Sequence, residues 1–130
     1  ETESQSILII EDDEITRDML TKSLETNDFK VIVAKNGKEA LERVTKTKPA
    51  LILLDLMMPE MDGFEFAEKL REKKEWLDIP VVVITAKDLT KEDHSRLKGN
   101  VEAIMQKGSY NKDELLREVG NRIKKLKEKG

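Results

Sequence analysis

The sequence predicts an α/β protein with one parallel sheet and helices on both of its faces. Five short apolar runs alternate along the 130 residues with longer amphipathic segments, and this alternation is typical of parallel strands joined by helical crossovers. Three of the runs, 7–10, 51–54 and 81–84, contain only apolar residues, as expected of strands buried on both faces. We therefore predict a doubly wound, five-stranded sheet with right-handed crossovers.

The first two units each place a strand before a helix. The strand at 7–10 is followed by a helix within 11–28, and the strand at 31–34, expected at an edge of the sheet, is followed by a helix within 36–48. Pro49 cannot continue that second helix, because proline lacks the backbone donor and clashes with the preceding turn. Helical spacing predicts these core-facing residues: Ile15, Met19, Leu20 and Leu24 in the first helix, and Ala40, Leu41 and Val44 in the second.

The third unit contains an unusual stretch, LILLDLMMPEMDGFEF at residues 51–66. Its apolar strand ends directly on Asp55, and the chain then enters a loop that Pro59 and Gly63 are expected to shape. A helix across 64–76 follows. The predicted inward face of this helix consists of Phe66, Ala67 and Leu70.

The last two units complete the sheet. The strand at 81–85 precedes a short, polar helix within 86–100. The strand at 102–106 includes two polar residues and is expected at the other edge, and a helix at 111–129 follows it. Two helix starts carry capping signals, Thr90 with Asp93 and Asn111 with Glu114. The apolar stripe of the last helix consists of Leu115, Leu116, Val119, Ile123 and Leu126.

Composition limits the classes of function. We expect a single domain at residues 7–127, residues 1–6 disordered, and no effector domain. The net charge of −3, from 27 acidic and 24 basic residues, does not suggest the basic surface that direct nucleic-acid binding needs. The chain has no cysteine, so thiolate metal sites and nucleophiles are excluded. No apolar run approaches the roughly 20 residues that span a bilayer, and we predict a cytoplasmic protein with no membrane partner.

Polar residues stand at the ends of four predicted strands. Glu11 and Asp12 follow the first strand, Asp55 follows the third, Thr85 ends the fourth and Lys107 follows the fifth. In open parallel sheets the ligand site lies outside the carboxyl ends of the strands. We therefore expect three carboxylates, one hydroxyl and one ammonium to converge there.

Three carboxylates held together repel one another, so a cation is expected among them. Clustered Asp and Glu oxygens suit Mg²⁺, which keeps several waters and leaves room for substrate oxygens. Lys107 can add a second positive charge. A metal and an ammonium facing one aspartate predict phosphoryl transfer, in which the Asp55 carboxylate attacks in line and becomes an acyl phosphate.

Taken singly, these residues have simpler structural roles. The acids could cap helices, the threonine could be an ordinary β-branched strand residue, and the lysine could be a solvated charge. Their coincidence at four strand ends favours a shared site. His94, the single histidine, lies in a charged segment and is expected on the surface.

Four segments in this order resemble the receiver domain of bacterial two-component response regulators: ILIIEDDE, LILLDLMMPEMDGFEF, VVVITAK and IMQKG. The resemblance extends from about residue 5 to 127, and its D-x-x-x-P-x-x-D-G element is specific. It implies a flavodoxin-like (βα)5 fold with strand order 2-1-3-4-5. It also implies a phosphoacceptor switch whose partner is a sensor histidine kinase or a histidine phosphotransfer domain.

The resemblance implies a role for each residue of the site. Asp55 would accept the phosphoryl group from a phosphohistidine, and Glu11 and Asp12 would hold Mg²⁺ together with Asp55 and the backbone carbonyl of Met57. Thr85 would bind a phosphoryl oxygen and shift toward it on activation, and Lys107 would pair with the phosphoryl group. Asp13, one position further along the chain, is given only a loop role.

Two positions depart from the family pattern. Gly108 follows the lysine where most receivers have proline, and Ile104 stands where an aromatic residue commonly couples to the hydroxyl. The usual coupling between threonine and aromatic ring is therefore in doubt. The segment QKGSYNKDELL is more similar to receivers attached to hybrid sensor kinases than to those attached to DNA-binding domains.

Other functions fit less well. The protein would catalyse only its own phosphoryl transfer and slow autodephosphorylation, not turnover of a separate substrate. A receiver-like module that acts through protein contacts without phosphorylation stays open, supported by Ile104 and Gly108. An aspartate-nucleophile phosphatase would need a second acid two residues after the nucleophile, where Met57 stands. Nucleotide binding is not supported, because NGKEAL lacks the earlier glycine and the Ser/Thr of a P-loop. A flavodoxin-like phosphate site is not supported either, because EDDE would repel a phosphate bound after the first strand.

Overall fold

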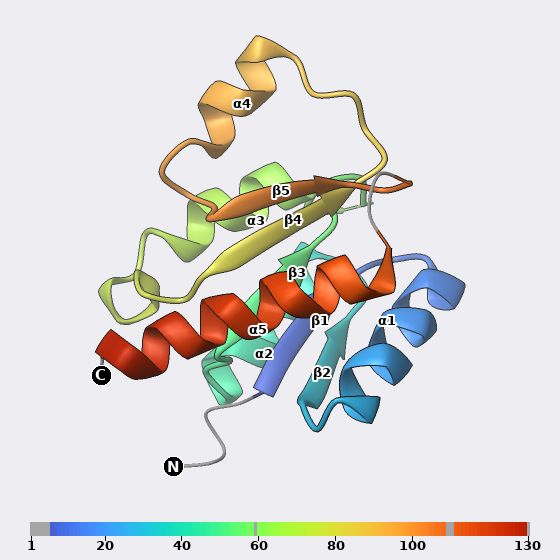
Figure 1. Ribbon diagram of the computed structural model, residues 1–130. Coiled ribbons are helices and arrows are strands. Elements are labelled where there is room, and N and C mark those ends of the chain that lie inside the picture. Colours follow the sequence, from blue (N-terminus) through green and yellow to red (C-terminus); the bar gives the residue numbers. More distant parts are fainter. Residues whose placement is uncertain (1–5, 59, 109–110, 130) are drawn as a thin grey trace.

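A five-stranded parallel sheet between two layers of helices forms the protein (Figure 1). The computed structural model describes residues 6–58, 60–108 and 111–129, with the backbone alone described at 112 and 124–129. The sheet order is β2-β1-β3-β4-β5, which confirms the predicted class and order. The strands are β1 (Ser6–Ile10), β2 (Lys30–Ala34), β3 (Leu51–Leu54), β4 (Val81–Thr85) and β5 (Ala103–Gln106).

The strand burial follows the sequence pattern. Every residue of β1, β3 and β4 is buried, and these are the three interior strands. β2 and β5 lie at the edges, as predicted. β1 begins at Ser6, within the segment expected to be disordered, and residues 1–5 lie outside the described range.

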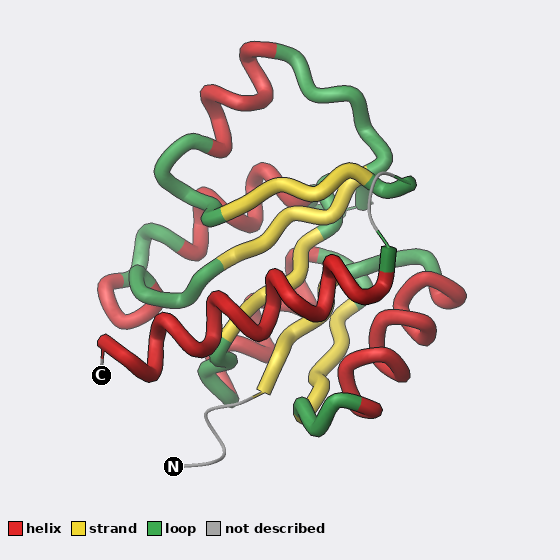
Figure 2. The backbone as a smooth tube through the Cα atoms, viewed as in Figure 1, coloured by secondary structure: helices red, strands yellow, loops and turns green. Residues whose placement is uncertain are grey.

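The helices cover the two faces of the sheet as separate groups (Figures 1 and 2). One apolar cluster joins the sheet to α2, α3 and α4, and a second joins it to α1 and α5. Among the described residues, no helix is both long enough and apolar enough to cross a membrane. The bounds are α1 (Glu14–Thr26), α2 (Gly37–Lys46), α3 (Gly63–Leu70), α4 (Lys91–Leu97) and α5 (Lys112–Lys129), with a 3-10 turn η2 (Lys74–Trp76) after α3.

Most predicted core faces are confirmed. In α2 and α3 the expected residues are buried, except for Leu41, which is half-buried. In α5 Leu115, Val119 and Ile123 are buried and Leu116 is half-buried, whereas the side chain of Leu126 lies outside the described residues. Both capping signals are confirmed: Thr90 with Asp93 forms a capping box, and Asn111 and Glu114 exchange backbone-to-side-chain bonds of 2.9 Å.

The predicted face of α1 is wrong in its first half. Leu24 is buried and Leu20 half-buried, but Ile15 is 72% and Met19 is 58% exposed. At about 100° per residue, Ile15 lies about 140° around the helix from Leu20. The four residues therefore form a stripe too wide for one contact, and α1 turns only its Leu20–Leu24 side toward the sheet and α5.

The helix predicted at 64–76 is also shorter than expected. α3 ends at Leu70, and Arg71 turns its guanidinium back onto the chain that follows. The Arg71 guanidinium donates hydrogen bonds of 2.9–3.2 Å to the carbonyls of Trp76, Leu77, Ile79 and Asn100. One side chain therefore satisfies carbonyls from η2, the segment between η2 and β4, and the α4–β5 connection, and the chain bends instead of continuing as a helix.

Arg71→Lys is expected to lower the free energy of unfolding by roughly 2–4 kcal/mol, because an ammonium cannot reach four carbonyls at once. Urea unfolding of the variant and the wild type measures this difference. Arg117→Lys, at an exposed position on α5, is the matched control and should stay within about 0.5 kcal/mol of the wild type. Equal stability of Arg71→Lys and its control would contradict the role assigned to Arg71.

Candidate functional site

The predicted polar residues converge at the carboxyl ends of the strands. Hydrogen bonds of the sheet continue one residue beyond the strands and fix the backbone there. The N–H of Glu11 donates to the Ala34 carbonyl at 3.1 Å, and the N–H of Asp55 donates to the Ile10 carbonyl at 3.0 Å. At the other side of the site, the N–H of Lys107 donates to the Thr85 carbonyl at 2.7 Å. The sheet therefore sets these positions before any side chain is considered.

Three carboxylates and one ammonium form the centre of the site. Glu11, Asp12 and Asp55 each offer an oxygen within 4.8 Å of the others. The Lys107 Nζ lies 2.9 Å from Glu11 Oε1 and 3.7 Å from Asp55 Oδ2. Glu11 and Asp55 are 2% and 5% exposed, whereas Asp12 is exposed. The cluster is thus anchored in the sheet but open to solvent on one side.

This donor set fits a hard divalent cation. Carboxylate oxygens are the ligands that Mg²⁺ and Ca²⁺ take, and Mg²⁺ is held by a few carboxylates while it keeps water on its open side. One exposed and two buried acids match that arrangement. Met57 lies two residues after Asp55, and its backbone N–H donates to Asp55 Oδ1 at 3.3 Å. The role of its carbonyl as a ligand stays a prediction.

Glu11 has the most perturbed acid–base chemistry of the cluster. The pKa of Glu11 is raised to about 7, mainly by burial and also by the charge of Asp55, although hydrogen bonds from Lys107 and the Asp13 N–H lower it. A carboxyl that keeps its proton near neutral pH can lose that proton when a cation binds, because the cation binds the carboxylate form. The site is therefore prepared for a positive ligand.

Asp13 caps α1, so Glu11 and Asp12 are not needed for that role. Only a loop role was predicted for Asp13, but it is the N-cap of α1: its Oδ2 accepts the Thr16 N–H at 2.9 Å and the Thr16 hydroxyl at 2.7 Å. Arg17, which the sequence analysis missed, donates from Nη1 to the Glu11 carbonyl at 3.0 Å. Aspartate is a preferred N-cap residue, so the role of Asp13 was available from the sequence.

Two glycines hold the loop after Asp55 close to the sheet. A Cβ on Gly63 would lie 2.6 Å from the Asp55 carbonyl oxygen, and one on Gly37 would lie 2.8 Å from the Met61 carbonyl oxygen. Gly63 and Gly37 donate their N–H groups to the Leu56 and Met61 carbonyls at 3.2 Å each. Gly63 therefore shapes the loop as predicted, and Pro59, named with it, lies outside the described residues.

Thr85 is fully buried at the end of β4. Its Oγ1 accepts the Lys87 N–H at 3.1 Å. The Lys87 Nζ in turn lies 2.8 Å from Asp93 Oδ2, and its hydrogen bond, with that of the Thr90 N–H, lowers the pKa of Asp93 to about 2. The connection between β4 and α4 is thus tied at both ends by polar contacts.

The two departures from the expected pattern have clear local structures. Ile104 is half-buried and packs against the cluster that joins the sheet to α2, α3 and α4. Gly108 has φ +89°, a region that glycine enters at little cost and other residues rarely adopt. The loop after Lys107 therefore uses glycine for a backbone conformation that a proline, with φ fixed near −65°, could not adopt.

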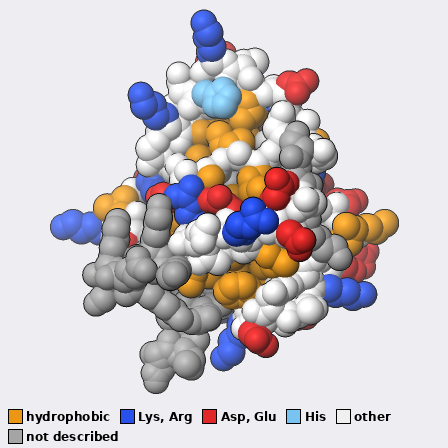
Figure 3. Space-filling view, in the orientation of Figure 1, with side chains coloured by type: hydrophobic (Ala, Val, Ile, Leu, Met, Phe, Trp, Pro, Cys, Tyr) orange, Lys and Arg blue, Asp and Glu red, His pale blue; other side chains and the backbone are white. Residues whose placement is uncertain are grey.

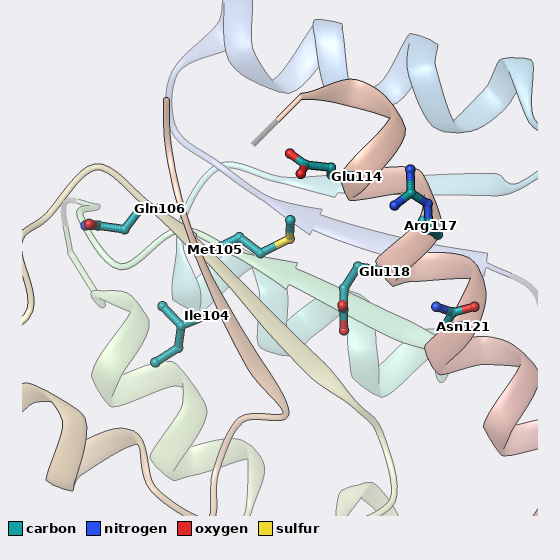
Figure 4. Close-up of a pocket in the computed structure, with 7 residues that line it drawn as sticks. All are labelled: Ile104, Met105, Gln106, Glu114, Arg117, Glu118 and Asn121. Carbon is teal, nitrogen blue, oxygen red and sulfur yellow. The ribbon is translucent and has the colours of Figure 1, made fainter. Parts of the chain in front are cut away.

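The surface over α4, β5 and α5 mixes charge types (Figure 3). Acidic and basic side chains are interspersed with apolar ones there, and the single histidine, His94 on α4, is exposed as predicted. A hollow of about 400 Å³ lies between β5 and α5 (Figure 4). It is separate from the carboxylates, and its lining consists of Ile104, Met105, Gln106, Glu114, Arg117, Glu118 and Asn121.

Comparison with known proteins shows which family and which relatives this chain resembles. The model of the response regulator receiver domain matches residues 7–120. The chain is 34% identical over 121 residues to the response regulator MprA of Mycobacterium leprae, across 93% of this chain and 52% of MprA. It is 43% identical over 96 residues to the transcriptional regulatory protein SrrA of Staphylococcus aureus, across 74% of this chain and 37% of SrrA. The chain thus spans about half or less of the length of these relatives.

Solved structures agree with this assignment. The signal receiver domain of a signal transduction histidine kinase from Syntrophus aciditrophicus superposes with a TM-score of 0.86 at 28% identity, covering 95% of this chain and 92% of that domain. The response regulator TrrA from Thermotoga maritima, in complex with Mg²⁺ and BeF, gives 0.80 at 29% identity, covering 91% and 98%.

In the absence of divalent cations, the free energy of unfolding is expected to fall as pH rises from about 4.5 to about 7. Between these values folded Glu11 keeps a proton that the unfolded chain releases, so the folded state binds more protons and loses stability with rising pH. Glu11→Gln removes this dependence. Its stability relative to the wild type should therefore rise by up to roughly 3 kcal/mol between pH 5 and pH 8.

Urea unfolding at both pH values, in a chelating buffer, measures this change. Glu42→Gln, at an exposed position on α2, is the matched control, and its pH profile should run parallel to that of the wild type. A parallel profile for Glu11→Gln as well would show that the Glu11 carboxyl titrates normally.

Proposed function

The chain belongs to the response regulator receiver domain family, and we propose that it is a phosphoacceptor switch in which Asp55 receives a phosphoryl group. One observation carries the proposal. The buried Asp55 carboxylate lies within reach of an ammonium, Lys107 Nζ at 3.7 Å, and of two further carboxylates that suit a divalent cation. This is the charge arrangement that in-line phosphoryl transfer to a carboxylate requires.

The reaction is a displacement at phosphorus. An Asp55 oxygen attacks the phosphorus of a phosphohistidine, the P–N bond breaks as the P–O bond forms, and the imidazole leaves with the electron pair and takes up a proton. Lys107 pairs with a phosphoryl oxygen. Thr85 already accepts the Lys87 N–H, so its own hydroxyl proton is left to donate to another phosphoryl oxygen. Glu11, Asp12, Asp55 and the Met57 carbonyl would hold Mg²⁺, which neutralises phosphoryl charge when bound.

The proposed partner is a protein that carries a phosphohistidine. Sensor histidine kinases and histidine phosphotransfer domains are the two classes that supply one to receivers, and a similar solved structure belongs to a signal transduction histidine kinase. Such donors are made from ATP, and the proposal accordingly places the chain in the cytoplasm. It also takes residues 7–127 as one functional domain that binds no nucleic acid itself and has no substrate besides its own aspartate.

A receiver-like module that works without phosphorylation is the alternative. Ile104 and Gly108 remain its support, because both alter parts of the family's usual response to phosphorylation. The carboxylate cluster is not needed by that alternative. Chemistry at Asp55 therefore distinguishes the two.

Incubation with Mg²⁺ and acetyl phosphate should add the mass of one phosphoryl group to the wild-type protein. Asp55→Asn should add none, because an amide is not a nucleophile toward phosphorus. Intact-mass spectrometry measures both. Asp113→Asn, at an exposed position in the first turn of α5, is the control and should be labelled like the wild type. An unlabelled wild type, under conditions that label another receiver, would favour the module that acts without phosphorylation.

The metal and the lysine are expected to have separate roles. Asp12→Asn should weaken Mg²⁺ binding tenfold or more by the loss of a charged ligand. Lys107→Ala should not weaken Mg²⁺ binding, because it removes no metal ligand and takes away a positive charge that repels the cation. It should slow phosphorylation instead. Calorimetry is the suitable measurement, because Trp76 lies in η2 before β4, at the end of the sheet away from the carboxylates. An equal loss of Mg²⁺ affinity in both variants would contradict this division.

A further inference from the structure

We propose that Gln106 is a positioning residue that sets the orientation of the Thr85 hydroxyl through the backbone of Lys87. This inference rests on the proposed function, since it concerns the hydroxyl that would meet the phosphoryl group. It assigns the coupling between β5 and the phosphoryl site to a side-chain amide, two residues after Ile104, where the family commonly uses an aromatic ring.

The first support is the direction of the Gln106 side chain. Gln106 is the last residue of β5 and pairs with Thr85 in the sheet register. Side chains alternate along a strand, and Figure 4 shows Gln106 and Ile104 pointing away from α5 while Met105 points toward it. The Gln106 amide therefore lies on the side of the β4–α4 connection. Its Nε2 donates to the Lys87 carbonyl at 2.5 Å.

The second support is that Lys87 is held at three points. Its N–H donates to Thr85 Oγ1 at 3.1 Å, its carbonyl accepts the Gln106 amide, and its ammonium lies 2.8 Å from Asp93 Oδ2. The Asp93 side chain is only 17% exposed, and that of Lys87 is 31% exposed. Residue 87 is thus fixed between β5 on one side and the first turn of α4 on the other.

These contacts determine what the Thr85 hydroxyl can do. A hydroxyl has one proton and two acceptor sites, and threonine has few favourable χ1 rotamers. While the Lys87 N–H occupies one acceptor site, the rotamer is fixed and the proton stays available to another acceptor. If the backbone of Lys87 were released, the buried hydroxyl would lose that partner and could turn to other rotamers.

Ile104 cannot supply this link, because its side chain has no polar atom. Gln106 can supply it, and two backbone contacts also connect this part of β5 to Thr85. The N–H of the next residue, Lys107, donates to the Thr85 carbonyl at 2.7 Å, and the Gln106 backbone is in register with Thr85 itself. A displacement of the end of β5 would therefore reach Thr85 through the backbone and through the amide together.

The test uses Gln106→Met, which keeps the length of the side chain and removes the donor. Beryllofluoride, which resembles a phosphoryl group on aspartate, is titrated with excess Mg²⁺ by calorimetry. Loss of one hydrogen bond predicts an affinity about tenfold weaker than that of the wild type. The Mg²⁺ affinity without beryllofluoride should stay within about twofold, because the bond that is removed is made to the Lys87 carbonyl and not to the carboxylates, and separate sites act nearly independently. Asn121→Met, at an exposed amide on α5, is the matched control.

A double-mutant cycle separates positioning from a general loss of structure. In a Thr85→Val background, which lacks the hydroxyl, Gln106→Met should have no further effect on beryllofluoride affinity. The χ1 populations of Thr85, from three-bond couplings in metal-free protein, should be single in the wild type and mixed in Gln106→Met. An unchanged affinity in Gln106→Met, or the same loss with and without the Thr85 hydroxyl, would overturn the inference.

The proposed function is tested separately by the wild type in the same titration. If the wild type binds no beryllofluoride, the proposed function fails, and the role of Gln106 fails with it. If the wild type binds and Asp55→Asn does not, the proposed function stands, and the comparison of Gln106→Met with the wild type decides the inference alone.

Discussion

Burial of like charges at one end of the sheet is the constraint on which this structure depends. Glu11 and Asp55 are almost fully buried, and with Asp12 they bring three carboxylates within 4.8 Å. Desolvation and mutual repulsion both oppose such a cluster. It persists because the acids directly follow β1 and β3, whose own residues are buried throughout. The apolar strands thus supply the free energy that keeps the acids together, and Lys107 supplies the nearest positive charge.

The helices around the cluster also favour its negative charge. α1 and α3 begin directly after the loops that carry the acids, at Glu14 and Gly63, and helix N-termini carry partial positive charge. Each start has its own aspartate cap, Asp13 for α1 and Asp62 for α3. Because the caps satisfy the first backbone donors, the buried acids are left with oxygens that can bind a ligand. Capping and ligand binding are therefore divided between neighbouring residues of the same type.

The sequence predicted the sheet and the members of the site, because both depend on short-range patterns. Apolar runs identify buried strands, and the residue after each strand must lie at the same edge of the sheet. It did not predict which half of the α1 stripe is buried, since the four apolar residues span more than one contact face and the packing against the sheet and α5 selects the Leu20–Leu24 side. It did not predict the end of α3 at Leu70, because Arg71 makes a contact with Asn100, far along the chain. The bond from Gln106 to Lys87 is hidden for the same reason.

A hydrogen bond and an aromatic ring would couple β5 to the phosphoryl site in physically different ways. Packing of a ring changes gradually with buried area, so a ring can follow its surroundings over a long movement. The bond from the Gln106 amide depends on distance and direction and weakens steeply once its geometry is lost. With Ile104 unable to follow the hydroxyl and Gly108 allowing the next loop its own conformation, the coupling proposed for this chain would be local and short-ranged. A partner that senses phosphorylation here would therefore have to contact the β4–α4 connection or the end of β5, where that bond is made or broken.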